Sequence, residues 1–77
     1  MNADGLLTLI AGTLGVPPPE VNEDSSMANT KKWDSLRQLM LVTELETTYG
    51  IELTEQEMHE TTSVRQIRAV LAARGVA

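Results

Sequence analysis

The chain has 77 residues, a formal net charge of −5 and no cysteine. A chain of this length makes one small domain that buries only about 60% of the surface its unfolded form exposes, and we take residues 1–77 as a single domain. The absence of cysteine excludes a disulfide framework and a cysteine metal site. The negative charge argues against nucleic acid as a partner, because binding it requires a basic face, and favours basic partner proteins.

Residues 6–16 are apolar enough to suggest a signal peptide, but Asp4 precedes them and no positively charged segment does. The run is also shorter than the about 20 apolar residues that a transmembrane helix needs. We therefore expect a cytoplasmic protein that does not bind a membrane.

The first predicted helix runs from about Ala3 to Leu14. Gly15 suits the left-handed residue that follows a helix, and the prolines at 17–19 prevent the helix from continuing. The apolar residues of this segment recur at helical spacing, at Leu6, Ile10 and Leu14.

A long connection, residues 16–33, follows the first helix. Loops of more than about 12–15 residues without structure of their own are uncommon in a small domain, so we expect apolar anchors within it. The candidates are Val16, Val21 and Met27.

Trp33, the single tryptophan, ends the connection. Its position before a helix favours packing of the loop end against the other helices, as in a hydrophobic staple. The alternative is direct contact with a partner, and we therefore keep Trp33 among the candidate docking residues.

Asp34-Ser35-Leu36 marks the start of the second helix, with Asp34 as a favourable N-cap. Ser35 then lies in the first helical turn, where its hydroxyl is expected to be exposed. The helix dipole favours an anion attached at that point. A serine so placed is a natural site for a phosphodiester.

The second predicted helix runs from Ser35 to Tyr49, and Gly50 ends it. Two apolar faces follow from a spacing of 3.6 residues per turn. One face, which we assign to the core, carries Leu41, Val42, Leu45 and Tyr49. The other carries Leu36, Leu39 and Met40, and is either a wide core stripe or, with Arg37, a partner-docking patch. We favour docking for Leu36 and Met40 and leave Leu39 open.

Two further helices are predicted. Thr54 and Glu57 have the spacing of a capping box at the start of a short helix, whose glutamates we expect to be solvated. Ser63 and Gln66 repeat the spacing at the start of the last helix, which Gly75 ends. The expected fold is all-α: a small antiparallel four-helix bundle with three main helices, a short third helix and a long loop between the first two.

We do not expect Ser35, Asp34 and His59 to form a catalytic triad. Nucleophilic catalysis needs a base within hydrogen-bond reach of the serine, whereas Asp34 is accounted for as the cap and His59 lies on a short, acidic, solvated segment. No residues show metal-ligand spacing. We therefore expect a chain without catalytic activity of its own.

The chain resembles the acyl carrier protein family over nearly its whole length. The resemblance lies in Asp34-Ser35-Leu36, in Met27 eight residues before the serine, and in the downstream residues Leu41, Leu45, Tyr49-Gly50, Leu53 and Val64. It implies that Ser35 receives phosphopantetheine from coenzyme A, and that the thiol of this arm holds acyl groups as thioesters. It also implies that Asp34 helps the modifying transferase.

The resemblance implies partners as well: a phosphopantetheinyl transferase, an acyl- or aminoacyl-loading ligase or acyltransferase, and synthase or tailoring enzymes. Fatty-acid carriers have glycine where Lys32 stands and often have acids where Arg37 and Met40 stand, and the Gly-Gly of peptidyl carriers is absent. We therefore expect a discrete, monomeric carrier of polyketide or mixed polyketide–peptide biosynthesis, such as that of an antibiotic. An aminoacyl or peptidyl carrier, or an unmodified helical interaction module, remains the alternative.

Overall fold

The structure is a computed structural model that describes residues 5–76. Within this range the chain forms four α-helices and one short 3₁₀ helix, and no strand. Their bounds are α1 Gly5–Leu14, η1 Pro18–Glu20, α2 Ser35–Tyr49, α3 Glu55–His59 and α4 Val64–Ala73. The all-α expectation is thus confirmed, and the expected helix residues Ala3 and Asp4 lie outside the described range.

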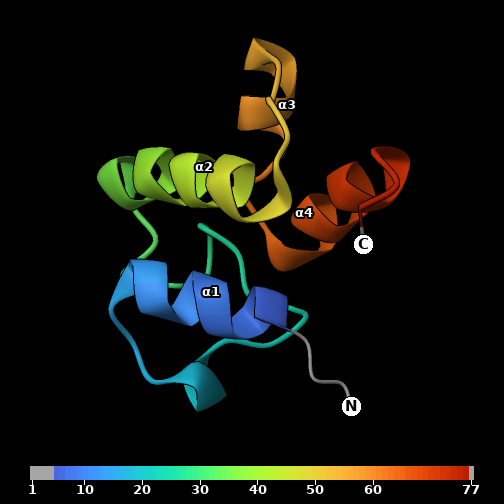
Figure 1. Cartoon of the computed structure of the whole chain (residues 1–77). Helices are drawn as coiled ribbons and strands as arrows, with labels where there is room; N and C mark the ends of the chain where they lie inside the picture. The colour runs from blue at the N-terminus through green and yellow to red at the C-terminus, as the bar shows by residue number, and fades with distance from the viewer. Residues whose placement is uncertain (1–4, 77) are drawn as a thin grey trace.

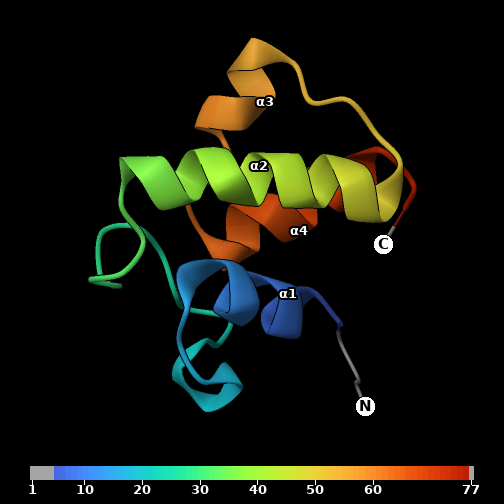
Figure 2. The same ribbon diagram turned by 60° about the vertical axis from the view of Figure 1, so that its left-hand side comes forward.

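The longest helix, α2, is the centre of the arrangement (Figures 1 and 2). Helix α1 runs beside it in the opposite direction, and α3 stands on the other side of α2 from α1. Helix α4 crosses behind α2 in Figure 2. None of the helices between residues 5 and 76 is both long and apolar enough to cross a membrane.

The core forms where α1, α2 and α4 meet. The first face predicted for α2 is buried as expected at Leu41, Val42 and Leu45, while Tyr49 is partly buried and packs against the same cluster. The matching face of α4 is fully apolar, which is why α4 docks despite its short length. Side chains with almost no exposed surface come from α1 (Leu6, Ile10, Leu14), α2 (Leu41, Leu45) and α4 (Val64, Ile67, Leu71).

The connection between α1 and α2 is anchored at both apolar and polar positions. Val21 is buried, and Val16 and Met27 are partly buried against the core, so the expected anchors are confirmed. The 3₁₀ turn η1 was not expected: the proline run that ends α1 has the fixed φ that also suits a 3₁₀ helix. It lies on the far side of α1 from α2 (Figures 1 and 2).

The middle of this connection is bound to the start of α4. The Met27 N–H donates to the Thr62 carbonyl oxygen at 2.9 Å, and the Val64 N–H donates to the Ser25 carbonyl oxygen at 3.0 Å. Ion pairs add to these bonds: Arg65 contacts Asp24 at 2.6 Å, and Arg68 contacts Glu23 at 2.5 Å. The acidic loop and the basic last helix, which look unrelated in the sequence, therefore pair with each other.

The predicted helix ends follow local capping chemistry. Thr54 and Glu57 form the complete capping box at the start of α3. At α4 only half of the expected box is present: the Ser63 hydroxyl accepts from the Gln66 N–H at 3.1 Å, but the Gln66 side chain accepts from the Thr62 N–H instead of the Ser63 N–H. Both arrangements satisfy backbone donors that the first turn of a helix leaves free.

Three glycines end helices in the left-handed conformation. Gly50 ends α2 as predicted, with φ 67°, and the Ile51 N–H after it donates to the Glu46 carbonyl oxygen at 3.2 Å. Gly15 has φ 73°, and the Val16 N–H donates to the Ala11 carbonyl oxygen at 3.0 Å. Gly75 also has φ 73° and is followed by the equivalent bond from Val76. This is the Schellman pattern, which favours glycine because other residues are strained at positive φ.

The expectation that the α3 glutamates are all solvated is wrong for Glu57. Glu55 and Glu60 are exposed, but Glu57 is half-buried against Arg74. Arg74 Nε donates to Glu57 Oε2 at 3.1 Å, its Nη2 contacts the second carboxylate oxygen, and the same Nη2 reaches the Glu52 carbonyl oxygen at 2.6 Å. The Arg74 hydrogen bonds, with the Thr54 N–H second, lower the pKa of Glu57 to about 2 from its usual 4.5.

The Glu57–Arg74 pair predicts a pH dependence of stability. Because the folded-state pKa lies below the unfolded one, the pair stabilises the fold fully above about pH 4.5, and this contribution is lost as the pH falls towards 2. In Arg74→Gln the Glu57 carboxyl should titrate nearer its usual range, as measured by carbon NMR. Arg65→Gln, which removes a cation paired with Asp24, is the control and should leave Glu57 unchanged. An unaltered Glu57 titration in Arg74→Gln would contradict the assignment.

Candidate functional site

The start of α2 presents an exposed serine on a well-ordered cap. The Asp34 carboxylate accepts a hydrogen bond from the Arg37 N–H at 2.9 Å, so the predicted N-cap is confirmed. Ser35 is the first residue of α2 and is exposed. No residue between 5 and 76 forms a hydrogen bond with its hydroxyl. The Ser35 oxygen is therefore free to react and lies at the positive end of the helix dipole.

A buried polar network fixes this helix start to the rest of the fold. Trp33 Nε1 donates to Gln38 Oε1 at 2.7 Å, and Gln38 Nε2 donates to Thr61 Oγ1 at 2.9 Å. The same Nε2 lies 3.3 Å from the Met58 carbonyl oxygen. One glutamine side chain thus joins the end of the long loop, the first turns of α2, and the segment after α3.

Trp33 does not belong to a docking surface. Its side chain is only 2% exposed and lies in the core, which corrects its inclusion among the candidate docking residues. The packing alternative is the one that the structure supports, because a large aromatic ring with its N–H paired is most stable when buried. A partner protein cannot reach it without unfolding the loop end.

The second apolar face of α2 points to solvent. Leu36 is 64% exposed, Leu39 is 65% exposed and Met40 is 45% exposed. These residues are therefore not a widened core stripe, and the position of Leu39, which the sequence left open, is settled as surface. We call Leu36, Leu39 and Met40 the outer ridge of α2.

An apolar groove of about 530 Å³ lies on the flank of α2 that faces α3. Its walls come from three segments: the loop (Met27), α2 (Leu39, Val42) and α3 (Met58). Ser35 stands at its edge, so a flexible group attached to the serine could reach these walls without crossing α2. We call this hollow the α2–α3 groove.

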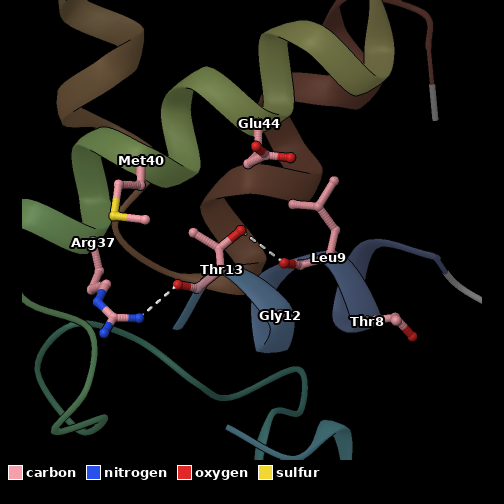
Figure 3. Close-up of a pocket in the computed structure, with 7 residues that line it drawn as sticks. All are labelled: Thr8, Leu9, Gly12, Thr13, Arg37, Met40 and Glu44. Atoms are coloured by element: carbon pink, nitrogen blue, oxygen red, sulfur yellow. Dashed lines mark hydrogen bonds between the residues drawn. The ribbon is translucent and has the colours of Figure 1, made fainter. Parts of the chain in front are cut away.

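The opposite flank of α2 faces α1 and has a different character. Arg37 and Met40 border this second groove, which has a volume of about 500 Å³ (Figure 3). Arg37 Nη1 donates to the Thr13 carbonyl oxygen at 2.9 Å, so its cation is held at the C-terminal end of α1. We call this hollow the α1–α2 groove. Arg37 and Met40 therefore lie on a different flank from the α2–α3 groove.

His59 borders the α2–α3 groove together with Ser35, a proximity that the sequence did not predict. The two residues come together because α3 stands across the groove from the first turns of α2. No hydrogen bond joins them in the described part of the chain, and the Asp34 carboxylate is engaged in the cap. The three residues therefore do not have the geometry of a catalytic triad.

Gln38 is the residue that sequence reasoning missed. A glutamine on a helix is ordinarily read as a solvated side chain, yet Gln38 is only 9% exposed. The available signal was Trp33, whose N–H needs a partner when the ring is buried. Gln38 lies five residues after Trp33, one helical turn after the cap, and its amide oxygen can accept this hydrogen bond.

The chain is similar to a known family over most of its length. A family model described as "Phosphopantetheine attachment site" matches residues 4–71 of this chain. The match covers α1, the long loop, α2, α3 and all of α4 except its last two residues. The family carries covalently attached phosphopantetheine, and its domains serve as non-catalytic carriers that work with transferases and synthases.

The Asp34 cap can be tested by stability alone. Asp34→Ala should lower the free energy of unfolding by about 0.5–2 kcal/mol, because the Arg37 N–H loses its acceptor. Asp34→Asn should lose little, since asparagine caps as well as aspartate does. Chemical denaturation of both variants measures the difference. Equal losses for alanine and asparagine would indicate that Asp34 acts through its charge and not as a cap.

Proposed function

Because this chain belongs to the phosphopantetheine attachment site family and is a phosphopantetheine carrier, we propose that Ser35 is the attachment residue. The observation that carries the proposal is the free, exposed hydroxyl at the start of α2, beside an apolar groove. Ser35 Oγ forms a phosphodiester with the pantetheine-bearing phosphorus of coenzyme A. Its proton is lost as adenosine 3′,5′-bisphosphate leaves.

The residues around Ser35 fit this group. The hydroxyl has no competing hydrogen bond among the described residues, and the N-terminus of a helix with 15 residues favours the negative phosphodiester. Lys31, Lys32 and Arg37 are the neighbouring cations in sequence. Asp34, which holds the cap, is proposed also to be recognised by the transferase.

The attached arm supplies a thiol that can hold cargo as a thioester. The chain's own residues then tether and present the cargo: the flexible link raises its effective concentration at each partner enzyme. The walls of the α2–α3 groove are mainly apolar, at Met27, Leu39, Val42 and Met58, and Glu55 and His59 also line it. The apolar part of the walls favours an apolar acyl cargo, because its surface is removed from water there.

We extend the proposal to the pathway and the partners. The chain is a discrete acyl carrier, expected to act as a monomer without catalytic activity of its own, in polyketide or related specialised biosynthesis. Its partners are a phosphopantetheinyl transferase, an acyl-loading enzyme and a synthase or tailoring enzyme. Leu36, Met40 and Arg37 are the proposed docking residues on α2, because two are exposed apolar side chains and the third is a partly exposed cation.

The attachment site is tested with Ser35→Ala. This variant should fold as the wild type does, because Asp34 and not Ser35 provides the cap. After incubation with coenzyme A and a broad-specificity phosphopantetheinyl transferase, the wild type should gain the mass of one phosphopantetheine group and Ser35→Ala should gain none. Thr47→Ala, an exposed hydroxyl on the same helix, is the control and should be modified. Modification of Ser35→Ala would reject the assignment.

The docking role of Met40 is tested with Met40→Glu. Stability should change by no more than about 0.5 kcal/mol, since Met40 lies on the surface. Transfer from a loading enzyme to the holo form should slow, because a partner would have to desolvate the new charge at an apolar contact. Thr47→Glu places the same charge on the same helix, away from Ser35, and should transfer normally. Normal transfer to Met40→Glu with a normal melting temperature would remove Met40 from the docking residues.

A further inference from the structure

Gly12 lies inside α1 without a structural reason for being glycine. It is exposed, its φ is not positive, and a Cβ built on it would meet no atom within 4 Å. Glycine inside a helix costs roughly 1 kcal/mol relative to alanine. The fold therefore loses stability at Gly12 and gains no turn, close helix contact or core space in return.

What Gly12 does provide is the open floor of the α1–α2 groove. Leu9 and Thr13 border this floor on α1, and Arg37, Met40 and Glu44 border it on α2 (Figure 3). Gly12 is one of the residues that line the hollow, and a Cβ built on it would have open space around it. The missing Cβ thus leaves space that nothing in the described chain occupies.

The two charged residues of this groove are of opposite sign and are held apart. Arg37 lies at the Thr13 end of the groove, and Glu44 lies two helical turns further along α2, towards Leu9 (Figure 3). The half-exposed Met40 lies between them, and methionine adapts its shape to an incoming apolar group. The groove therefore has a mixed lining, with two apolar side chains at Leu9 and Met40, two threonines, a positive end and a negative end.

Any enzyme that modifies Ser35 must come close to this groove. At 1.5 Å per residue, Met40 is about 8 Å and Glu44 about 14 Å from Ser35 along the helix axis. A standard protein interface covers about 800 Å² on each partner, which is a patch about 30 Å across. An enzyme that seats Ser35 and crosses the outer ridge of α2 therefore reaches the α1–α2 groove.

The other possible occupants fit less well. An acyl chain on Ser35 has the mainly apolar α2–α3 groove beside it, and the α1–α2 groove, which lies on the opposite flank, has fewer apolar side chains in its lining. A second copy of this chain has the same net charge of −5, which opposes association.

We propose that the α1–α2 groove is a recognition site for the phosphopantetheinyl transferase, which inserts one apolar side chain over Gly12, between Leu9 and Met40. An acidic residue of the enzyme faces Arg37 and a basic residue faces Glu44. The inference rests on the proposed function and adds to it a second recognition element on α1. Glycine at position 12 leaves space for the side chain of the partner, and it lowers the stability of α1.

The test varies the size of residue 12 and measures two quantities. Gly12→Ala should raise the melting temperature by about 4 °C, as expected from helix propensity in a chain of this size. It should lower kcat/KM for modification by a broad-specificity phosphopantetheinyl transferase about fivefold, mainly through KM. Gly12→Gln should lower it further. Gly5→Ala and Gly5→Gln are matched controls, because Gly5 is also helical, exposed and without atoms within 4 Å.

The charged residues at the two ends of the α1–α2 groove allow a second, independent experiment. Glu44→Lys should slow modification several-fold at low salt, and the effect should shrink as salt is raised. Glu20→Lys makes the same change in net charge on η1, on the far side of α1, and should be modified at the wild-type rate (Figure 1).

Each result separates the inference from the function on which it rests. If the wild type is modified and both Gly12 variants are modified equally fast, the recognition site is rejected and the proposed function stands. If the wild type is never modified, the proposed function fails and the inference fails with it. A change in the sedimentation of the Gly12 variants, with no change in kcat/KM, would indicate that the groove binds a second copy of the chain. A change in the rate at which a loaded acyl group is hydrolysed, again with no change in kcat/KM, would indicate that the groove binds the cargo. Either result would exclude the transferase as the occupant.

Discussion

The position of the exposed serine depends on one buried side chain, Gln38. A buried polar group without a partner costs about 1–3 kcal/mol, so Trp33, Gln38 and Thr61 stabilise the fold only in the single arrangement that pairs all of them. That arrangement fixes the end of the long loop, the first turns of α2 and the segment after α3 relative to one another. Ser35, two residues from Trp33, is positioned by the same network.

The four sides of helix α2 have different surroundings. One side packs in the core, the opposite side is the exposed outer ridge, and the two flanks border grooves of similar size but different chemistry. The flank with Ser35 is apolar and suits the cargo of a tethered arm. The flank with Arg37 and Met40 carries separated charges and suits a protein surface. A helix of 15 residues can serve all of these because successive residues turn by a fixed angle around its axis.

The acidic character of the chain is only partly a property of its surface. Asp24, Glu23 and Glu57 are neutralised by arginines of the last helix and its end. These pairs connect the long loop and α3 to α4, and two of them join residues more than forty positions apart in the sequence. The first turns of α2, by contrast, carry Arg37 and three exposed apolar residues. A partner that docks beside Ser35 therefore contacts a surface that is more apolar and less acidic than the net charge of the chain suggests.

The sequence by itself determined the local features of this protein. The Asp34 and Ser63 caps, the Thr54–Glu57 box, the glycine ends and the core face of α2 follow from bonds and spacings within a few residues, and the Asp34-Ser35-Leu36 motif with its flanking helices indicated the family. Only the tertiary structure decided which residues far apart in the chain meet. It buried Trp33 on Gln38, paired Glu57 with Arg74, brought His59 to the edge of the Ser35 groove, and opened the groove above Gly12. Such contacts depend on how whole helices pack, and the spacing of residues along one helix does not specify its orientation against another.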